Sequence, residues 1–274
     1  MKKTILLLLT LVCVQAFAQL TREEHKENYL RQIRTLGYCG VGVSTLLDRW
    51  EKAFPDDPDA KIGRFNYYLN TGVHTELVRK EQDKYMGAQP AATLKDGDGK
   101  PVKYFEETFY DDASFAESQK YIDEVISRYP DNVDFKVAKI NALFSLEKEY
   151  PDIAASELEK LINDYRISGS DWTMSGEKLE GDEFAGLIQE YLAYLYSIGG
   201  DIAYNLFNSI SIKMARMYPG NSDFLSNQGS FWLVVKQNPK KAISFYDKAL
   251  KINPEDQAAL KNRKISERQL AKKK

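Results

Sequence analysis

The sequence predicts an all-α protein built as a solenoid of stacked helical hairpins. A turn phrase that begins with Pro and reaches Asp four residues later recurs at residues 55–59, 130–134 and 219–223. Each copy follows a last helical turn that ends in Phe or Tyr, and each is followed by apolar residues at helical spacing. A chain that reuses one phrase to stop and start helices is typical of helical repeats.

The N-terminal residues are expected to lie outside this fold. Two lysines precede the apolar run 5–14, and Ala16–Ala18 forms a small-x-small site just before Gln19. This pattern predicts a secretory signal peptide over residues 1–18, because the apolar run is too short to span a membrane.

A lipoprotein signal that uses Cys13 is the alternative, but the residues just before Cys13 are not the small ones that such signals carry.

The expected mature domain, 19–274, keeps 36 of the 38 basic residues against 40 acidic ones, a net charge of −4. Nucleic acid is not an expected partner, since that affinity comes mostly from cationic contacts with phosphates. Cys39 is then the only cysteine, so no intramolecular disulfide can form. We expect an exported protein, periplasmic or secreted, with no transmembrane span after signal cleavage.

In the N-terminal half, apolar residues at helical spacing predict helices near 22–36 and 43–54. A helix after Pro55 and a second one near 75–86 form the next expected pair. Residues 87–112 interrupt the pattern as an insert. Two Asp-Gly pairs, flanked by alternating apolar residues, predict a hairpin or extended loop there.

In the C-terminal half, Asp134 and Pro151 open two further expected helices. Residues 166–182 form a second insert, rich in Ser, Gly and Asp, and the next helices are expected near 183–198 and 201–217. The segment 256–271 is expected to be a capping helix with a polar outer face, which a solenoid needs for solubility.

The clearest unit, residues 223–256, resembles a tetratricopeptide repeat (TPR). The positions that pack in that family fall on Ser226, Gly229, Ser230, Leu233, Ala242, Tyr246, Ala249 and Pro254. Small residues at Gly229 and Ala242 let two helices approach, and Tyr246 fills the space between repeats. The resemblance implies a right-handed superhelical solenoid of about six repeats, one of them broken, over roughly 20–270.

The resemblance also implies a binding surface. In TPR proteins the first helices of successive repeats line a concave groove, and ligands touch fixed positions on them. The ninth position falls on Tyr67, Tyr196 and Phe231, and the fifth position of the last unit falls on Asn227. Aromatic anchors beside an amide are typical of a peptide-binding surface.

No catalytic motif accompanies these features. The only histidines, His25 and His74, are far apart in the sequence, and no metal-ligand, phosphate-loop or nucleophile motif occurs. The segment from Asp96 partly copies a calcium loop, but Lys100 and Pro101 stand where that loop needs an oxygen ligand and a glycine. We expect no catalytic residue, no metal site and no cofactor.

The sequence therefore favours a non-enzymatic scaffold or adaptor of the bacterial envelope that binds a protein or peptide in its groove. One alternative is a glycan- or cell-wall-binding accessory protein, in which a surface aromatic such as Trp172 stacks on sugars. A third hypothesis is an enzyme whose residues are scattered across the two inserts.

Overall fold

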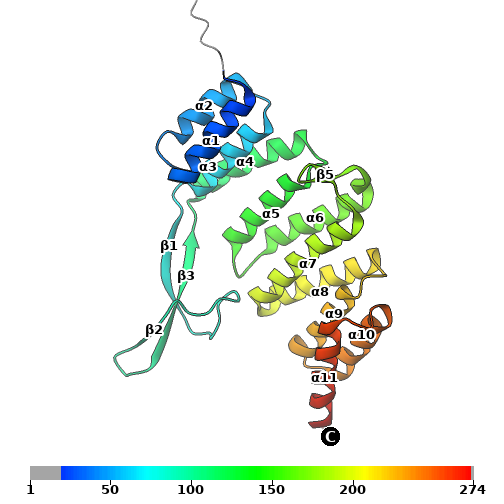
Figure 1. Cartoon of the computed structure of the whole chain (residues 1–274). Helices are drawn as coiled ribbons and strands as arrows, with labels where there is room; N and C mark the ends of the chain where they lie inside the picture. The colour runs from blue at the N-terminus through cyan, green and yellow to red at the C-terminus, as the bar shows by residue number, and fades with distance from the viewer. Residues whose placement is uncertain (1–19, 273–274) are drawn as a thin grey trace, which may run out of the picture.

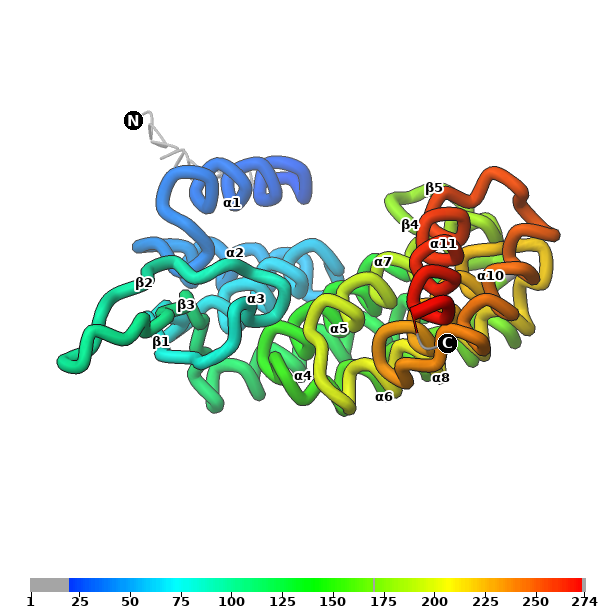
Figure 2. Tube along the Cα trace, turned by 90° about the horizontal axis from the view of Figure 1, so that it is seen from below, coloured from blue at the N-terminus to red at the C-terminus, as the bar shows by residue number. Residues whose placement is uncertain are grey.

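The structure, a computed structural model, describes residues 20–272. The predicted signal peptide, 1–18, lies outside the described residues. The described chain is a stack of helical hairpins that runs from α1 at one end to α11 at the other, with a three-stranded sheet that projects from it (Figure 1 and Figure 2). The predicted all-α repeat solenoid is therefore confirmed, with short strands added.

The first hairpin consists of α1 (Arg22–Leu36) and α2 (Val43–Ala53), as predicted. The second consists of α3 (Pro58–Asn70) and α4 (Asp112–Arg128), which pack against each other although a three-stranded sheet separates them in sequence. Tyr29, Val43, Leu47, Trp50 and Ala60 form the core of this end of the molecule.

The sheet consists of β1 (His74–Lys80), β2 (Ala92–Lys95) and β3 (Pro101–Phe109), in the order β1-β3-β2. The helix predicted near 75–86 is wrong, because all seven residues of β1 pair antiparallel with β3. The hairpin predicted within 87–112 is confirmed by the antiparallel pairing of β2 with β3. One Oδ of Asp96 accepts the N–H groups of Asp98 and Lys100 and so holds that turn.

The next two hairpins are α5 (Val133–Glu147) with α6 (Asp152–Ser168), and α7 (Gly181–Ile198) with α8 (Gly200–Met217). Between α6 and α7, a 3₁₀ turn (Gly169–Asp171) leads to the two-residue strands β4 (Thr173–Met174) and β5 (Glu177–Lys178). The largest core cluster runs from α3 to the turn after α9 and joins these hairpins.

The last hairpin begins with α9 (Asp223–Ser230), which continues as a π-helical turn, Phe231–Val235, and pairs with α10 (Pro239–Ile252). The predicted cap is α11 (Gln257–Lys272). A Cβ on Gly229 would lie 2.5 Å from Cε1 of Tyr246, so the close helix approach expected from the TPR resemblance is present. Residues 20–272 thus hold five hairpins and a cap, not about six repeats.

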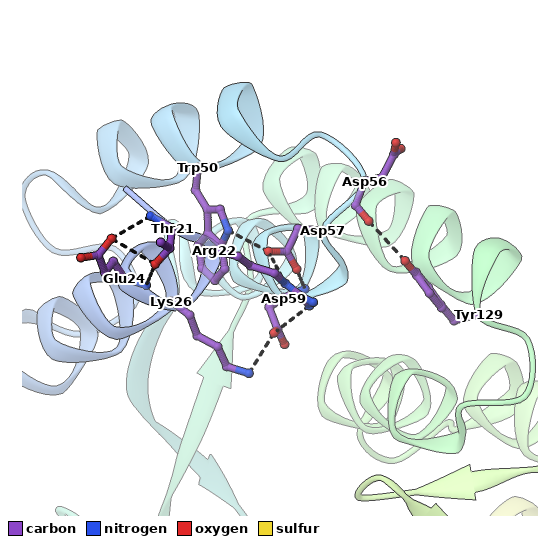
Figure 3. Close-up of polar contacts among 9 residues, drawn as sticks. All are labelled: Thr21, Arg22, Glu24, Lys26, Trp50, Asp56, Asp57, Asp59 and Tyr129. Carbon is purple, nitrogen blue, oxygen red and sulfur yellow. Dashed lines mark hydrogen bonds and ion pairs between the residues drawn. The ribbon is translucent and has the colours of Figure 1, made fainter. Parts of the chain in front are cut away.

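The recurring turn phrase acts through its third residue. Asp57, Asn132 and Asn221 each accept, through Oδ1, the backbone N–H two residues later, at 2.9–3.0 Å. Such side chains satisfy an N–H group at a helix start that has no partner within the helix. Asp57 is also buried, and its Oδ2 accepts from Trp50 Nε1 and Arg22 Nε, both at 2.8 Å (Figure 3).

Candidate binding groove

A hollow of about 350 Å³ lies between α5 and α7, the first helices of two neighbouring hairpins. We call it the α5–α7 groove. It is lined by Val137, Asn141, Phe144, Ser145, Leu187, Glu190, Tyr191 and Tyr194. The lining residues recur at intervals of three and four on each helix, so one face of α5 opposes one face of α7.

The floor of the groove is aromatic. The ring of Phe144 stacks on Tyr191 with centroids 5.7 Å apart, and it meets the edge of Tyr194 at 5.3 Å. Phe144 and Tyr191 are buried, whereas Tyr194 is half-buried. Burial raises the pKa of the Tyr191 hydroxyl, which remains protonated and donates to Oδ1 of Asn141 at 2.8 Å. These contacts hold the floor in one arrangement.

The rim of the groove is polar. Asn141, Ser145 and Glu190 are exposed there, while Val137 and Leu187 are half-buried between rim and floor. An apolar, aromatic floor with a polar rim is the usual anatomy of a protein-binding surface. Larger hollows exist elsewhere, such as one of about 580 Å³ beside α1, but polar residues of a single exposed helix dominate its walls.

The sheet extends the groove on one side. A notch of about 240 Å³, the β3 notch, lies between β3, the loop before β2 and the end of α5. It is lined by Tyr85, Met86, Ala88, Glu106, Glu107, Thr108, Tyr110, Ser145 and Lys148, and it shares Ser145 with the α5–α7 groove. Burial raises the pKa of Tyr194 in the groove, and nearby Tyr110 of the notch raises it further.

Ion pairs fix the sheet against the solenoid. Glu107 of β3 contacts Nζ of Lys148 at 2.6 Å and Nζ of Lys80 at 3.4 Å, and Lys80 also contacts Glu149 at 3.1 Å. Burial alone would raise the pKa of Glu107, but the hydrogen bond and charge of Lys148, together with Lys80, outweigh it and lower the pKa. Glu107 is thus held as a carboxylate between two lysines.

One predicted site residue is buried, and a second packs against the neighbouring helix. Phe231 is 3 % exposed and belongs to the core, which contradicts its expected place as a surface anchor. Tyr196 is half-buried and packs on Tyr204 and Phe207 of α8, with centroids 5.4 and 5.1 Å away. Tyr196 lies two positions after Tyr194, about 200° around the helix, so it turns away from the α5–α7 groove.

The other two predicted residues are half-buried and lie apart from the groove lining. Asn227 of α9 exchanges hydrogen bonds with Gln189 of α7, at 2.8 and 3.4 Å, so its amide already has a partner. Tyr67 lies on α3, where its ring meets the edge of Tyr68 at 5.5 Å. The structure does not bring the four predicted residues together, and their role in binding remains a prediction.

The sequence did not point to the groove residues because the repeat boundaries expected from the turn positions differ from the ends of the helices. If Pro219 holds the turn position that Pro254 holds in the unit from Asp223, a unit starts at residue 188, and this start gives Tyr196 as the ninth position. In the structure, α7 begins at Gly181 and α8 ends at Met217. Both helices have 18 residues, longer than a repeat of about 34 residues allows. The spacing of Leu187, Tyr191 and Tyr194 was the available signal.

The residues considered for other chemistry have structural partners. Trp172 is 1 % exposed and packs against Tyr165, so its expected place on the surface is wrong. His25 is buried and stacks on Trp50, and His74 stacks on Phe109. Within residues 20–272, no group of three His, Cys, Asp or Glu residues is arranged to hold a metal ion. Over the same range, no helix combines the length and apolar character needed to cross a membrane.

Comparisons with known proteins add a distant likeness to a solved structure. No family model and no curated protein matches the chain. Among solved structures, the TPR domain of P58(IPK) is similar over 92 % of this chain and 57 % of that one, with 14 % identity and a TM-score of 0.32. The chain thus spans little more than half the length of that neighbour. Because the TM-score is low, the fold assignment rests on the helical hairpins themselves.

Proposed function

We propose that this chain is a non-enzymatic scaffold or adaptor that binds a protein or peptide in the α5–α7 groove. The observation that carries the proposal is the aromatic floor of Phe144, Tyr191 and Tyr194 beneath a polar rim. Buried aromatic side chains in a water-excluding pocket supply most of the binding energy at protein interfaces. Helical solenoids use surfaces of this kind for binding.

Contacts between α5 and α7 join the two sides of the groove, which favours binding. The hydrogen bond between Tyr191 and Asn141 joins α7 to α5, and the Phe144 ring packs against both tyrosines. A surface that is already ordered loses less conformational entropy when a partner binds.

We further propose that the protein acts in the bacterial envelope after export, periplasmic or secreted. The support is the N-terminal sequence, in which a basic start, an apolar run and a small-x-small site precede Gln19. Mass spectrometry of the N-terminus of the protein recovered from the envelope fraction tests this. A chain that begins at Gln19 is expected, and an uncleaved chain in the cytoplasm would contradict export.

Binding is tested with peptides selected from a random 12-residue display library on the mature protein. We expect Leu187→Arg, which places a charge beside the aromatic floor, to weaken binding of a selected peptide at least tenfold. Ile167→Arg is the matched control, because Ile167 on α6 is 77 % exposed and lies outside the groove. Equal affinity of both variants and the parent protein would contradict the proposal.

The glycan-binding alternative has lost its sequence support. It depended on Trp172 as a surface aromatic, and this side chain is buried against Tyr165 with Lys136 Nζ 4.1 Å from its ring centroid. Trp172 instead anchors the second insert to the core.

A further inference from the structure

The central strand of the sheet has an edge that no strand of the described chain covers. β1 pairs with β3 over residues 103–109, whereas β2 pairs on the opposite side only over residues 101–104. The part of β3 from Phe105 to Phe109 therefore has a partner strand on one side only. An uncovered strand edge is a ready template for another extended chain.

The turn between β2 and β3 shows which backbone groups lie on that edge. Asp96 N–H donates to Lys100 O at 2.9 Å, so this is a hydrogen-bonded pair of the antiparallel ladder. Hydrogen-bonded and non-hydrogen-bonded pairs alternate along such a ladder. Residues 102 and 104 thus bond toward β2, and by the same alternation the N–H and C=O groups of Glu106 and Thr108 point to the uncovered edge. Among the described residues, the N–H and C=O groups of Glu106 and Thr108 form no backbone hydrogen bond on that side.

This edge opens into the binding surface rather than away from it. Glu106, Glu107, Thr108 and Tyr110 form the strand side of the β3 notch. Ser145 and Lys148 at the end of α5 form a second side, and Tyr85, Met86 and Ala88 of the loop before β2 form a third. In Figure 1, β3 lies on the side of the sheet nearer α5, and β1 lies on the far side. Since Ser145 lines both hollows, the notch beside β3 adjoins the α5–α7 groove.

The charges along this path favour a basic partner. Glu106 in the notch and Glu190 on the groove rim are both exposed, and within residues 20–272 neither forms an ion pair. The other acid of the notch, Glu107, is neutralised by Lys148 and Lys80. The uncompensated charge that a ligand meets is thus negative at two points.

We propose that an extended segment of a partner protein, carrying an apolar side chain and at least one Lys or Arg, adds as a strand to β3 at Glu106–Thr108. Its apolar side chain enters the α5–α7 groove, and its basic side chain lies between Glu106 and Glu190. Main-chain hydrogen bonds supply affinity in this binding mode, and pockets for alternate side chains supply specificity. This inference rests on the proposed function and names the class of partner.

The test uses a peptide selected on the mature protein, resynthesised as a series in which one backbone amide at a time is N-methylated. Strand addition predicts a loss of at least tenfold at alternate amides over a short stretch, because only every second N–H faces β3. A uniform or absent effect of N-methylation would overturn strand addition.

A pair of proline variants locates the edge. Thr108→Pro removes an N–H group from the uncovered edge of β3, and Thr75→Pro removes one from the outer edge of β1 directly opposite. Proline is tolerated at strand edges where the N–H faces solvent, and circular dichroism melting verifies that both variants fold. We expect Thr108→Pro to weaken the peptide at least tenfold and Thr75→Pro to leave it unchanged. The reverse result would assign the peptide to β1 and overturn the proposal.

The variant Leu187→Arg distinguishes the proposed groove binding from the proposed strand addition. If Leu187→Arg abolishes binding while the N-methyl series and Thr108→Pro have no effect, strand addition is wrong and groove binding stands. If Leu187→Arg has no effect, both are wrong. The double variant Glu106→Gln, Glu190→Gln is expected to weaken the peptide about threefold or more at low salt, and unchanged affinity would overturn the basic character of the partner.

Discussion

Glu107 in β3 and Lys148, the residue just after α5, form an ion pair of 2.6 Å between Oε1 and Nζ although they lie 41 positions apart in the sequence. Their side chains are only 12 % and 19 % exposed. The same ammonium lies 4.0 Å from the ring centroid of Phe109 in β3. This pair ties the sheet to the solenoid, and both residues line the β3 notch.

Replacement of Lys148 by Met should loosen the sheet. The change removes a charged hydrogen bond from a mostly buried carboxylate, so we expect a loss of about 2 kcal/mol in the free energy of unfolding. Hydrogen exchange should become faster in residues 74–109 and stay unchanged in α10. Glu106→Gln is the control, because Glu106 is exposed. Equal exchange in Lys148→Met and the parent protein would show that the pair does not hold the sheet.

The contribution of Glu107 should depend on pH. Its pKa in the folded protein is lowered, so its stabilising effect is present above the unfolded value of about 4.3 and is lost as pH falls through the folded-state pKa. Urea unfolding of the parent protein and Glu107→Gln measures this difference. We expect about 1–2 kcal/mol at pH 7 and a difference that shrinks toward zero as the pH falls through the folded-state pKa. A difference that stays constant over this range would refute the assignment.

Two glycines in first helices should respond in opposite ways to alanine. At Gly229 a Cβ would lie 2.5 Å from the fully buried ring of Tyr246, so Gly229→Ala should destabilise by about 2 kcal/mol. At Gly186 in α7 a Cβ meets nothing within 4 Å, so Gly186→Ala should stabilise by about 0.5–1 kcal/mol. Thermal melting of both variants gives the comparison. A harmless Gly229→Ala would mean that α9 and α10 are not packed this closely.

The two neighbouring aspartates of the first turn phrase should differ in importance. Asp57→Ala leaves Trp50 Nε1 without an acceptor and removes a helix cap, for an expected cost of about 2–4 kcal/mol. Asp56 is exposed and pairs with Arg128 at the surface, so Asp56→Ala should cost less than about 1 kcal/mol. Chemical unfolding monitored by circular dichroism distinguishes them, and equal costs would contradict the arrangement in Figure 3.

Helices were predictable from the sequence where their signals are local. The stop and start phrases place the boundaries of α3, α5, α9 and α11 within a few residues, because an Asx side chain caps a nearby N–H group. The strand β1 was not predictable this way, since its partner β3 lies beyond the loop and β2. The repeat count was too high because the helix expected near 75–86 is a strand and α3 pairs with α4 instead.

The binding surface was less predictable than the fold. Which side of a long helix faces its neighbour depends on the start of that helix, and an error of a few residues moves a side chain to another face. Tyr196 therefore appeared as a surface anchor, although Tyr191 and Tyr194 line the groove. Phe231 and Trp172 show a second limit, because an aromatic residue has the same sequence signal in a core as on a surface.

The central claim is that the α5–α7 groove holds a partner protein, and photo-cross-linking in the native host tests it most directly. A photoreactive phenylalanine replaces Tyr194 in one strain and Ile167, on the exposed side of α6, in another. Groove binding predicts a discrete cross-linked protein from position 194. This product should disappear when Leu187→Arg is added, and no product is expected from position 167. Cross-links from position 167 alone, or a product at 194 that persists with Leu187→Arg, would contradict it.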